Sequence, residues 1–404
     1  MTQTLYKEVP GGVTAPQGFS AAGVAAGIKN GKKDVALLVS DRPAAAAGVF
    51  TTNRVKAFPV LVSMRHLEDG SARAVVANSG NANACNGPQG EGDALSMIAQ
   101  AASLLGIPAD QVLVASTGVI GQPMPMDKVL DGIRRAAAEL NPQGGADAAT
   151  AIMTTDTVLK EEAVTLELDG CPVTVGGMAK GSGMIHPNMA TMLAFVATDA
   201  AIAQGLLQQA LKQVVDRTFN MITVDGDTST NDAVLALANG AAGNPPIEAE
   251  GPAYAAFCAA LETVCRKLAV AVARDGEGAT KLLEVRVLGA ATDDDARRAA
   301  KSVAASSLVK SAVFGEDANW GRVLCAAGYS GAAFNPDAVD IYLGEIKVAE
   351  NGGALPFDEE AAALVLAQKE VVFTIDLKQG SAQATAWGCD LTYDYVRING
   401  SYRT

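Results

Sequence analysis

The order of apolar segments is the feature that most constrains how this chain folds. Short apolar runs typical of strands alternate with longer segments of helical spacing, and a hairpin is expected around Asp169-Gly170. Strands are expected at 34–40, 58–64, 72–78, 111–116, 191–198 and 281–289, and helices at 92–106, 126–140, 204–219 and 253–274. Three late segments alternate with period two, as antiparallel strands do. The pattern favours α+β layers over a doubly wound parallel sheet.

Small side chains indicate how closely those layers pack. Alanine and glycine together make up 117 of the 404 residues, whereas aromatic residues make up 5%. Such a chain is suited to helices and sheets in close contact rather than to a core built around large rings. With 49% hydrophobic and 19% charged residues, the composition is typical of a folded protein and not of a disordered one.

The charge balance excludes several partners. Asp and Glu outnumber Lys and Arg by 44 to 31, which gives a formal net charge of −13. A nucleic-acid-binding protein needs a basic face to displace counterions from phosphates, and no Lys/Arg run here exceeds two residues. No apolar stretch approaches the ~20 residues that span a bilayer, and the first residues lack a secretory signal pattern. We therefore expect a cytoplasmic protein that binds neither nucleic acid nor membrane.

Histidine and cysteine usage limits the chemistry further. The six cysteines are scattered without a C-x-x-C motif and are expected to be reduced and mostly buried. Because His66 and His186 are the only histidines, a His-rich zinc site is excluded. The acidic run 225–232 resembles a calcium loop but has Thr230 where the loop glycine belongs and Ala236 where the bidentate Glu belongs. No metal and no cofactor are expected.

Thr191 is the first candidate nucleophile. It follows a glycine-rich segment and begins an apolar run that is typical of a buried strand. A threonine hydroxyl needs a base, and a chain-terminal α-amine with a pKa of about 7.7–8.0 can be one. The alternative is that Thr191 simply suits a strand, as β-branched residues do.

Three other features allow either a role in catalysis or binding or a purely structural role. Thr117 and Gly118 follow the strand at 111–116 and can stabilise an oxyanion, or they can form a common turn. Cys85 can act as a nucleophile with His66 as base, or as a small buried apolar residue. The loops 274–281 and 315–322 can hold substrate charges or form surface turns.

Several long motifs together resemble one enzyme family. The run KGSGMIHPNMATMLAF (180–195) resembles the self-cleavage segment of the ornithine acetyltransferases, the glutamate N-acetyltransferases of the cyclic arginine pathway. Further motifs that are similar to this family, and in its order, are FTTNRVKAFPV (50–60), NSGNANACNG (78–87), ASTGVIG (115–121), TVDGDTSTND (223–232), ARDGEGATK (273–281), FGEDANWGR (314–322) and INGSYRT (398–404). The resemblance covers essentially the whole chain.

The resemblance implies a fold and a maturation step. The expected fold is a four-layer α/β/β/α sandwich with mixed sheets over 1–280, followed by a smaller α+β lobe over 281–404 whose tail reaches the site. The precursor is expected to be cut between Ala190 and Thr191 into chains 1–190 and 191–404, which assemble as α₂β₂. Gly400 is expected to let the tail turn after a strand at 381–393.

The resemblance also implies site residues and an activity. Thr191 is the implied nucleophile, and Thr117 and Gly118 are the implied oxyanion hole. The implied substrate contacts are Thr154, Lys180, Thr191, Glu277, Asn399 and Thr404. The implied enzyme is an acyltransferase that moves an acetyl group from N2-acetylornithine to glutamate through an acetyl-threonine. Acetyl-CoA as a second donor is left open. The alternatives are a self-cleaving aminopeptidase or amidase and, more remotely, a non-enzymatic metabolite-binding protein.

Overall fold

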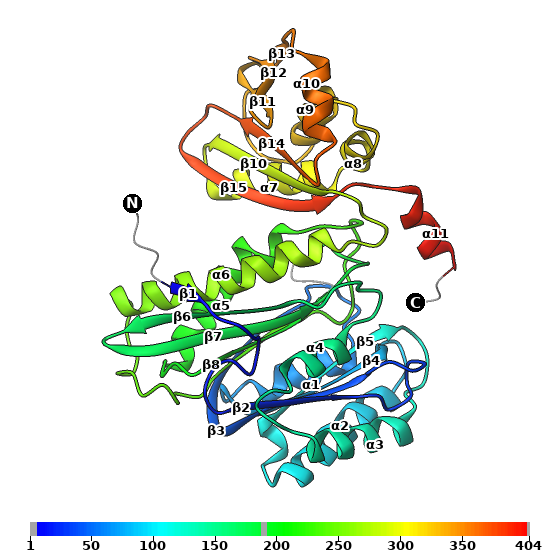
Figure 1. Ribbon diagram of the computed structural model, residues 1–404, viewed down its shortest axis with the longest axis vertical. Coiled ribbons are helices and arrows are strands. Elements are labelled where there is room, and N and C mark those ends of the chain that lie inside the picture. The colour runs from blue at the N-terminus through cyan, green and yellow to red at the C-terminus, as the bar shows by residue number, and fades with distance from the viewer. Residues whose placement is uncertain (1–5, 187–191, 402–404) are drawn as a thin grey trace.

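The computed structural model describes residues 6–186 and 192–401, which form two mixed sheets with helices packed on them (Figure 1). The larger sheet has the strand order β1-β6-β7-β8-β9-β3-β4-β5, with β2 paired to β3. Its strands are β1 (Tyr6–Glu8), β2 (Phe19–Val24), β3 (Val35–Phe50), β4 (Ser71–Asn81), β5 (Val112–Val119), β6 (Glu161–Leu168), β7 (Cys171–Lys180), β8 (Leu193–Thr198) and β9 (Ala233–Ala238). The β4/β5 and β8/β9 pairs are parallel.

Strand β3 joins the two halves of this sheet. Residues 35–40 of its 16 residues pair with β2, whereas residues 45–50 pair with β9. The register of β3 against β4 shifts between Val39 and Ala44, which marks a bulge or irregularity where pairing passes from one half to the other. The two halves therefore lie face to face as two layers of one continuous sheet.

The strands bury both of their faces. In β3, Leu38 belongs to the core between the two sheet layers, and its neighbour Leu37 belongs to the core under the outer helices. In β8, Phe195 lies in the inner core and Val196 packs towards the opposite helical layer. Successive strand side chains point to opposite faces, so an uninterrupted apolar run is what a doubly covered strand requires.

Helices cover both outer faces of the sandwich. Figure 1 shows α5 and α6 over the strands β6 to β8, and α2 and α3 under β2 to β4. The outer helices are α1 (Phe58–His66), α2 (Gln89–Leu105), α3 (Met126–Ala138), α5 (Gln204–Arg217) and α6 (Pro252–Arg274), with short 3₁₀ turns η1 (Ala109–Gln111) and η2 (Phe219–Met221). Helix α4 (Gly145–Ile152) instead packs into the core between the two sheet layers. The expected four-layer α/β/β/α sandwich with mixed strands is confirmed.

One strand prediction is wrong. Residues 58–64 belong to the helix α1, not to a strand. Pro59 stands in the first turn, where a proline is tolerated because the amide there has no helical partner. The Ser63 hydroxyl donates to the Val114 carbonyl at 2.7 Å and accepts from the Val114 amide at 2.8 Å, which fixes α1 on β5. A short apolar run buried by such contacts fits either state, so periodicity alone did not distinguish them.

A second sheet follows α6, in the order β13-β12-β11-β14-β10-β15. Only β10 and β14 pair in parallel among its strand pairs in the described part of the chain. Its strands are β10 (Leu282–Ala290), β11 (Asp340–Leu343), β12 (Ile346–Glu350), β13 (Gly353–Ala354), β14 (Glu370–Asp376) and β15 (Ala382–Cys389). The accompanying helices are α7 (Asp293–Ala305), α8 (Ser307–Phe314), α9 (Trp320–Gly328) and α10 (Glu359–Leu366), with η3 at Pro336–Ala338. Thr292 is the N-cap of α7, and its side chain accepts from the Asp295 amide.

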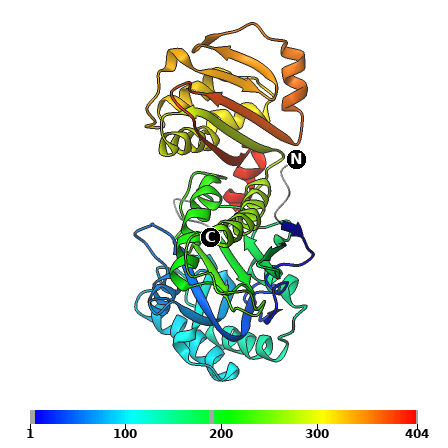
Figure 2. The same ribbon diagram turned by 90° about the vertical axis from the view of Figure 1, so that its left-hand side faces the viewer.

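The last helix returns from the second sheet towards the first. Helix α11 (Tyr393–Ser401) lies beside the junction of the two sheets in both views (Figures 1 and 2). The expected turn at Gly400 is wrong, because Gly400 lies inside this helix. Across the two described ranges, no helix is both long and apolar enough to cross a membrane.

Candidate active site

A cavity of about 260 Å³ brings together residues from six distant parts of the chain. These parts are the end of β5, the loop after α4, the end of β7, the loop between η2 and β9, the loop after α6, and helix α11. Its lining consists of Thr117, Gly118, Ile120, Thr154, Thr155, Lys180, Gly183, Met184, Asp225, Asp227, Ser229, Asn231, Glu277, Tyr395 and Asn399. The lining is mainly polar and includes charges of both signs, as a zwitterionic ligand requires.

Six of the residues expected at the site line this one cavity. They are Thr117, Gly118, Thr154, Lys180, Glu277 and Asn399. Ala190, Thr191 and Thr404 lie outside the described residues. A small adjoining pocket of about 10 Å³ extends past Thr117 and Lys180 to Met192, the residue after Thr191. The described chain therefore re-enters the fold beside the cavity next to the predicted nucleophile.

Gly118 fits a backbone position that excludes a side chain. Its φ is +130°, a conformation that L-residues rarely adopt. A Cβ at this position would stand 2.6 Å from the Asn81 nitrogen, because β5 and β4 lie side by side there. The adjoining strand end is held by Asn231 Nδ2, which donates to the Ser116 carbonyl at 2.8 Å. Glycine thus allows the strand to end tightly against β4 at the cavity wall.

Lys180 supplies a buried cation at the end of β7. Its side chain is 5% exposed, and its Nζ lies 4.0 Å from Asp156 Oδ2. Burial lowers the pKa of Lys180 because an ammonium is poorly solvated there, and the Asp156 carboxylate acts in the opposite direction. A buried ammonium whose ion pair with Asp156 lies beyond hydrogen-bond distance is suited to bind a carboxylate.

Glu277 supplies the opposite charge. Its amide donates to the Ser182 carbonyl at 2.9 Å, and one carboxylate oxygen accepts from Asn399 Nδ2 at 2.8 Å. Asn399 lies on α11, so the last helix fixes the orientation of an acidic side chain in the cavity wall. A carboxylate held in this way can receive a cationic amine.

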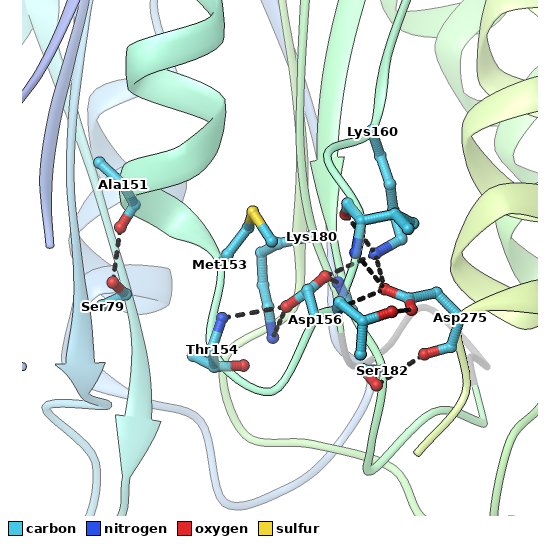
Figure 3. Close-up of polar contacts among 12 residues, drawn as sticks. Ser79, Ala151, Met153, Thr154, Asp156, Lys160, Lys180, Ser182 and Asp275 are labelled. Atoms are coloured by element: carbon cyan, nitrogen blue, oxygen red, sulfur yellow. Dashed lines mark hydrogen bonds and ion pairs between the residues drawn. The ribbon is translucent and has the colours of Figure 1, made fainter. Parts of the chain in front are cut away.

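The loop that carries Thr154 is fixed by a buried aspartate. The Thr154 amide donates to Asp156 Oδ2 at 3.0 Å, and Lys160 Nζ donates to Asp156 Oδ1 at 2.8 Å (Figure 3). At the other end of this view, the Ser79 hydroxyl donates to the Ala151 carbonyl at 2.5 Å, which holds the end of α4 on β4. Burial alone would raise the pKa of Asp156, but Lys180 and Lys160 lower it to about 2.

The acidic run 225–232 serves as a backbone scaffold in the structure. The Asp225 carboxylate accepts from the Met184 amide at 2.6 Å and from the Ile185 amide at 2.8 Å. It also accepts from the Tyr395 hydroxyl at 3.3 Å. These contacts hold the chain just before the predicted cleavage point, and burial raises the pKa of Asp225. Within the described ranges, no group of three or more His, Cys, Asp or Glu is arranged to hold a metal.

The histidines and cysteines lie outside the cavity lining. His66 Nδ1 lies 2.9 Å from the Val112 carbonyl, and His186 Nδ1 lies 3.0 Å from the Thr223 hydroxyl. Cys85 is exposed, so its expected burial is wrong, and of all six cysteines only Cys265 and Cys389 are fully buried. In the structure, Cys85 occupies a loop position with φ +58° rather than a place in the core.

Sequence reasoning missed the residues that hold the site in place. Asp225 was weighed as a metal ligand, and Asp156, Lys160, Asp275 and Tyr395 were not identified. The available signals were that Asp156 lies two residues after Thr154 and that Asp275 lies in the loop 274–281 considered for substrate charges. Of the two loops considered for substrate charges, 274–281 contributes Glu277, whereas 315–322 lines a separate cavity with Phe357 and Glu359.

The fold places the chain among the four-layer α/β/β/α proteins, and comparison with known proteins defines the family. The sequence model of the ArgJ family matches residues 20–404. The chain is 64% identical over 397 residues to the arginine biosynthesis bifunctional protein ArgJ of Symbiobacterium thermophilum, which covers 98% of this chain and 99% of the relative. It is 56% identical over 398 residues to the ArgJ protein of Caldanaerobacter subterraneus subsp. tengcongensis, with 98% and 99% covered.

A solved structure agrees with these relatives. The crystal structure of the arginine biosynthesis bifunctional protein ArgJ from Bacillus halodurans is 51% identical, covers 52% of this chain and 100% of its own, and gives a TM-score of 0.51. The chain belongs to the ArgJ family. The resemblance expected from the sequence is confirmed, and so is the expectation of an acyltransferase of arginine biosynthesis.

Proposed function

We propose that this protein is a glutamate N-acetyltransferase that moves an acetyl group from N2-acetylornithine to glutamate. The observation that carries the proposal is the pairing of Lys180 and Glu277 in one small cavity that also contains Thr117 and Gly118. Donor and acceptor share an α-carboxylate and an α-nitrogen but differ in side-chain charge. A cavity with one cationic and one anionic wall group suits both.

Maturation begins with attack of the Thr191 hydroxyl on the Ala190 carbonyl carbon. The peptide C–N bond breaks, the hydroxyl proton passes to the departing nitrogen, and an ester joins Ala190 to the Thr191 oxygen. Water then hydrolyses the ester, which leaves a carboxylate on Ala190 and a free α-amine on Thr191. The precursor thus becomes chains 1–190 and 191–404.

Transfer uses the new α-amine as base. The amine takes the Thr191 hydroxyl proton while the oxygen attacks the acetyl carbonyl of N2-acetylornithine. Thr117 and Gly118 donate to the oxyanion of the tetrahedral intermediate. Ornithine leaves with the proton, and the amine of glutamate then attacks the acetyl-threonine ester to give N-acetylglutamate and the free hydroxyl.

Charged side chains orient the two substrates. Lys180 receives a substrate carboxylate, and Glu277, oriented by Asn399, receives the cationic side chain of ornithine. Thr154 and Thr404 complete the substrate contacts. We further propose that residues 1–280 form the catalytic unit, that 281–404 form a lobe whose tail reaches the site, and that the cut chains assemble as α₂β₂ in the cytoplasm. Acetyl-CoA as a second donor would make the enzyme bifunctional.

The fate of the acetyl group tests this proposal. Purified protein is incubated with N2-acetylornithine labelled in the acetyl group, with and without glutamate, and N-acetylglutamate and free acetate are quantified. Label that passes to glutamate faster than acetate appears supports the transferase. Acetate as the main product in the presence of glutamate indicates an amidase, and neither product indicates a metabolite-binding protein. A parallel incubation with acetyl-CoA and glutamate tests the second donor.

A further inference from the structure

Two lysines and two aspartates form a buried row of alternating charges behind the cavity wall. The row runs Lys180, Asp156, Lys160, Asp275, and Figure 3 shows the four side chains converging from the end of β7 to the loop after α6. The side chains of Asp156 and Lys160 are 0% exposed, and those of Lys180 and Asp275 are 5% exposed. Lys180 is the one member of the row that lines the cavity.

Asp156 contacts two segments that line the cavity, the loop with Thr154 and the end of β7 with Lys180. Its Oδ2 accepts from the Thr154 amide at 3.0 Å and lies 4.0 Å from Lys180 Nζ. Its Oδ1 accepts from Lys160 Nζ at 2.8 Å and from the Gly181 amide at 2.6 Å. One carboxylate therefore fixes the peptide of Thr154 and the peptide that follows Lys180.

Lys160 and Asp275 extend the row to the opposite wall. Lys160 Nζ donates to Asp275 Oδ2 at 2.6 Å, and the Thr157 amide donates to the same oxygen at 3.0 Å. The Ser182 hydroxyl donates to the Asp275 carbonyl at 2.6 Å. Because Ser182 also accepts from the Glu277 amide, the cationic and anionic walls of the cavity share one framework.

The charge on Lys180 depends on this row. Burial disfavours its ammonium, and the groups that face it are Asp156 and Lys160 behind it, Asp232 before β9, Glu277 across the cavity and Lys29 from the loop after β2. Asp156, Asp232 and Glu277 favour the protonated form, whereas Lys160 and Lys29 oppose it. Asp156 is the strongest of the favourable groups.

The separation between Lys180 and Asp156 is important for binding. At 4.0 Å the two groups form an ion pair but lie beyond hydrogen-bond distance, so Asp156 stabilises the charge without occupying the ammonium protons. Lys160 Nζ lies closer to the Asp156 carboxylate than Lys180 Nζ does, so Asp156 makes its hydrogen bond with Lys160 and not with Lys180. The ammonium protons of Lys180 are then directed at a ligand in the cavity.

We propose that Asp156 is a positioning residue that keeps Lys180 protonated and directed at a substrate carboxylate, with Lys160 and Asp275 balancing its charge. The expected effect of Asp156 on acetyl-transfer kinetics rests on the proposed transferase function, whereas its effect on the protonation of Lys180 does not. Asp156 itself is fully buried and does not line the cavity. A purely structural role for Asp156 predicts a loss of stability without any change in the titration of Lys180.

The test titrates Lys180 directly. The protein is labelled with ¹³C at lysine Cε, and the Lys180 resonance is assigned by its absence in Lys180→Met. Removal of a nearby opposite charge shifts a pKa by about 1–3 units, so Asp156→Asn is expected to lower the titration midpoint of Lys180 by at least about 1 unit. Lys160→Met is expected to move it upwards, and the double variant Asp156→Asn/Lys160→Met to fall between the two single variants.

Asp340→Asn is the matched control. Asp340 is also nearly enclosed and lies 2.9 Å from Lys347 and 2.6 Å from Lys378, and these contacts help to lower its pKa to about 2 despite burial. It lies on β11 in the second sheet, away from the cavity lining. Its substitution should lower the melting temperature, as Asp156→Asn does, but leave the titration of Lys180 where it is in the parent.

The kinetic arm measures kcat/KM for glutamate against pH, per mole of chain that begins at Thr191. Asp156→Asn should move the alkaline limb to lower pH by the same interval as the midpoint of Lys180, and raise KM about tenfold or more above that pH. A Lys180 midpoint that moves by less than about 0.3 units in Asp156→Asn, or equally in Asp340→Asn, overturns the proposal. A shifted midpoint in a protein that transfers no acetyl group upholds the role of Asp156 and contradicts the transferase instead.

Discussion

Asn399 Nδ2 donates to Glu277 Oε2 at 2.8 Å across 122 residues of sequence. Helix α11 is held at this point by a second contact, in which the Thr392 hydroxyl donates to the Gly278 carbonyl at 2.7 Å. Helix α11 is therefore part of the cavity wall. Its contribution is to hold one acidic side chain in place.

Loss of the Asn399 amide should weaken use of the cationic substrate. In Asn399→Ala, the Glu277 carboxylate keeps its charge but loses the donor that orients it. We expect kcat/KM for N2-acetylornithine to fall about tenfold, the scale of one hydrogen bond to a charged group, with a smaller effect for glutamate. Steady-state rates with each substrate varied in turn measure both effects.

Gly400→Ala is the control for this variant. It alters the same helix, and a Cβ at Gly400 meets no atom within 4 Å among the described residues. Alanine favours a helix more than glycine does, so this variant should keep the parent rates. Equal losses in both variants would assign the effect to the helix as a whole and remove Asn399 from the site.

Thr117 should contribute to chemistry more than to binding. Thr117→Ala removes one proposed oxyanion donor and leaves the Gly118 amide in place. We expect kcat to fall by roughly 10²–10³ with little change in KM, and self-cleavage to slow if the same donors serve both reactions. Thr117→Ser retains the hydroxyl and should recover most of the rate. A variant that raises KM alone would make Thr117 a substrate contact.

Protonation of His186 should destabilise the protein in mild acid. Burial and the nearby Lys301 ammonium lower the pKa of His186 to about 4, from a usual value near 6.5. The unfolded chain binds a proton on this ring more readily than the folded chain, so stability falls as the pH drops from about 6.5 towards about 4.

The size of this effect follows from the pKa difference. As the pH falls from about 7 to about 5, proton binding to His186 in the unfolded chain should lower the free energy of unfolding by about 1–2 kcal/mol. Urea unfolding of the parent and of His186→Gln at both pH values measures it as the difference between their pH dependences. Identical pH dependences in the two proteins would show that His186 is not held neutral by the fold.

The sequence predicted most of the sandwich because its strands are buried on both faces. A continuous apolar run such as 193–198 identifies a doubly covered strand, and the Asp169-Gly170 pair identifies the β6–β7 turn, where both residues have positive φ. Residues 58–64 were predicted as a strand because a short apolar helix packed on β5 shows no clear helical periodicity in its sequence. Helix α11 was missed because its fixed contacts, Asn399 to Glu277 and Thr392 to Gly278, are made with a distant loop.

Some residues of the candidate site could also be predicted from the sequence, and others could not. The cavity-lining residues Lys180 and Glu277 lie in motifs that a family resemblance identifies, so they were named from the sequence. Lys160 and Asp275 are 115 residues apart, and no local pattern predicts that they pair. Buried charge pairs of this kind depend on tertiary packing and become visible only in the folded structure.

A covalent acetyl-enzyme requires ping-pong kinetics. Double-reciprocal plots with N2-acetylornithine and glutamate varied should give parallel lines, because ornithine leaves before glutamate reacts. Enzyme mixed with N2-acetylornithine alone should carry one acetyl group on the 191–404 chain, detected by mass spectrometry of the quenched protein. Intersecting lines without an acetylated chain would indicate direct transfer in a ternary complex.

Intact mass and amino-terminal sequencing of the purified protein test the central claim most directly. The account predicts two chains of 190 and 214 residues, the second beginning at Thr191, in every active preparation. Thr191→Ala should remain one chain of 404 residues and transfer no acetyl group, because both reactions use the same hydroxyl. A wild-type protein that stays uncut and transfers acetyl groups at full rate would contradict the account.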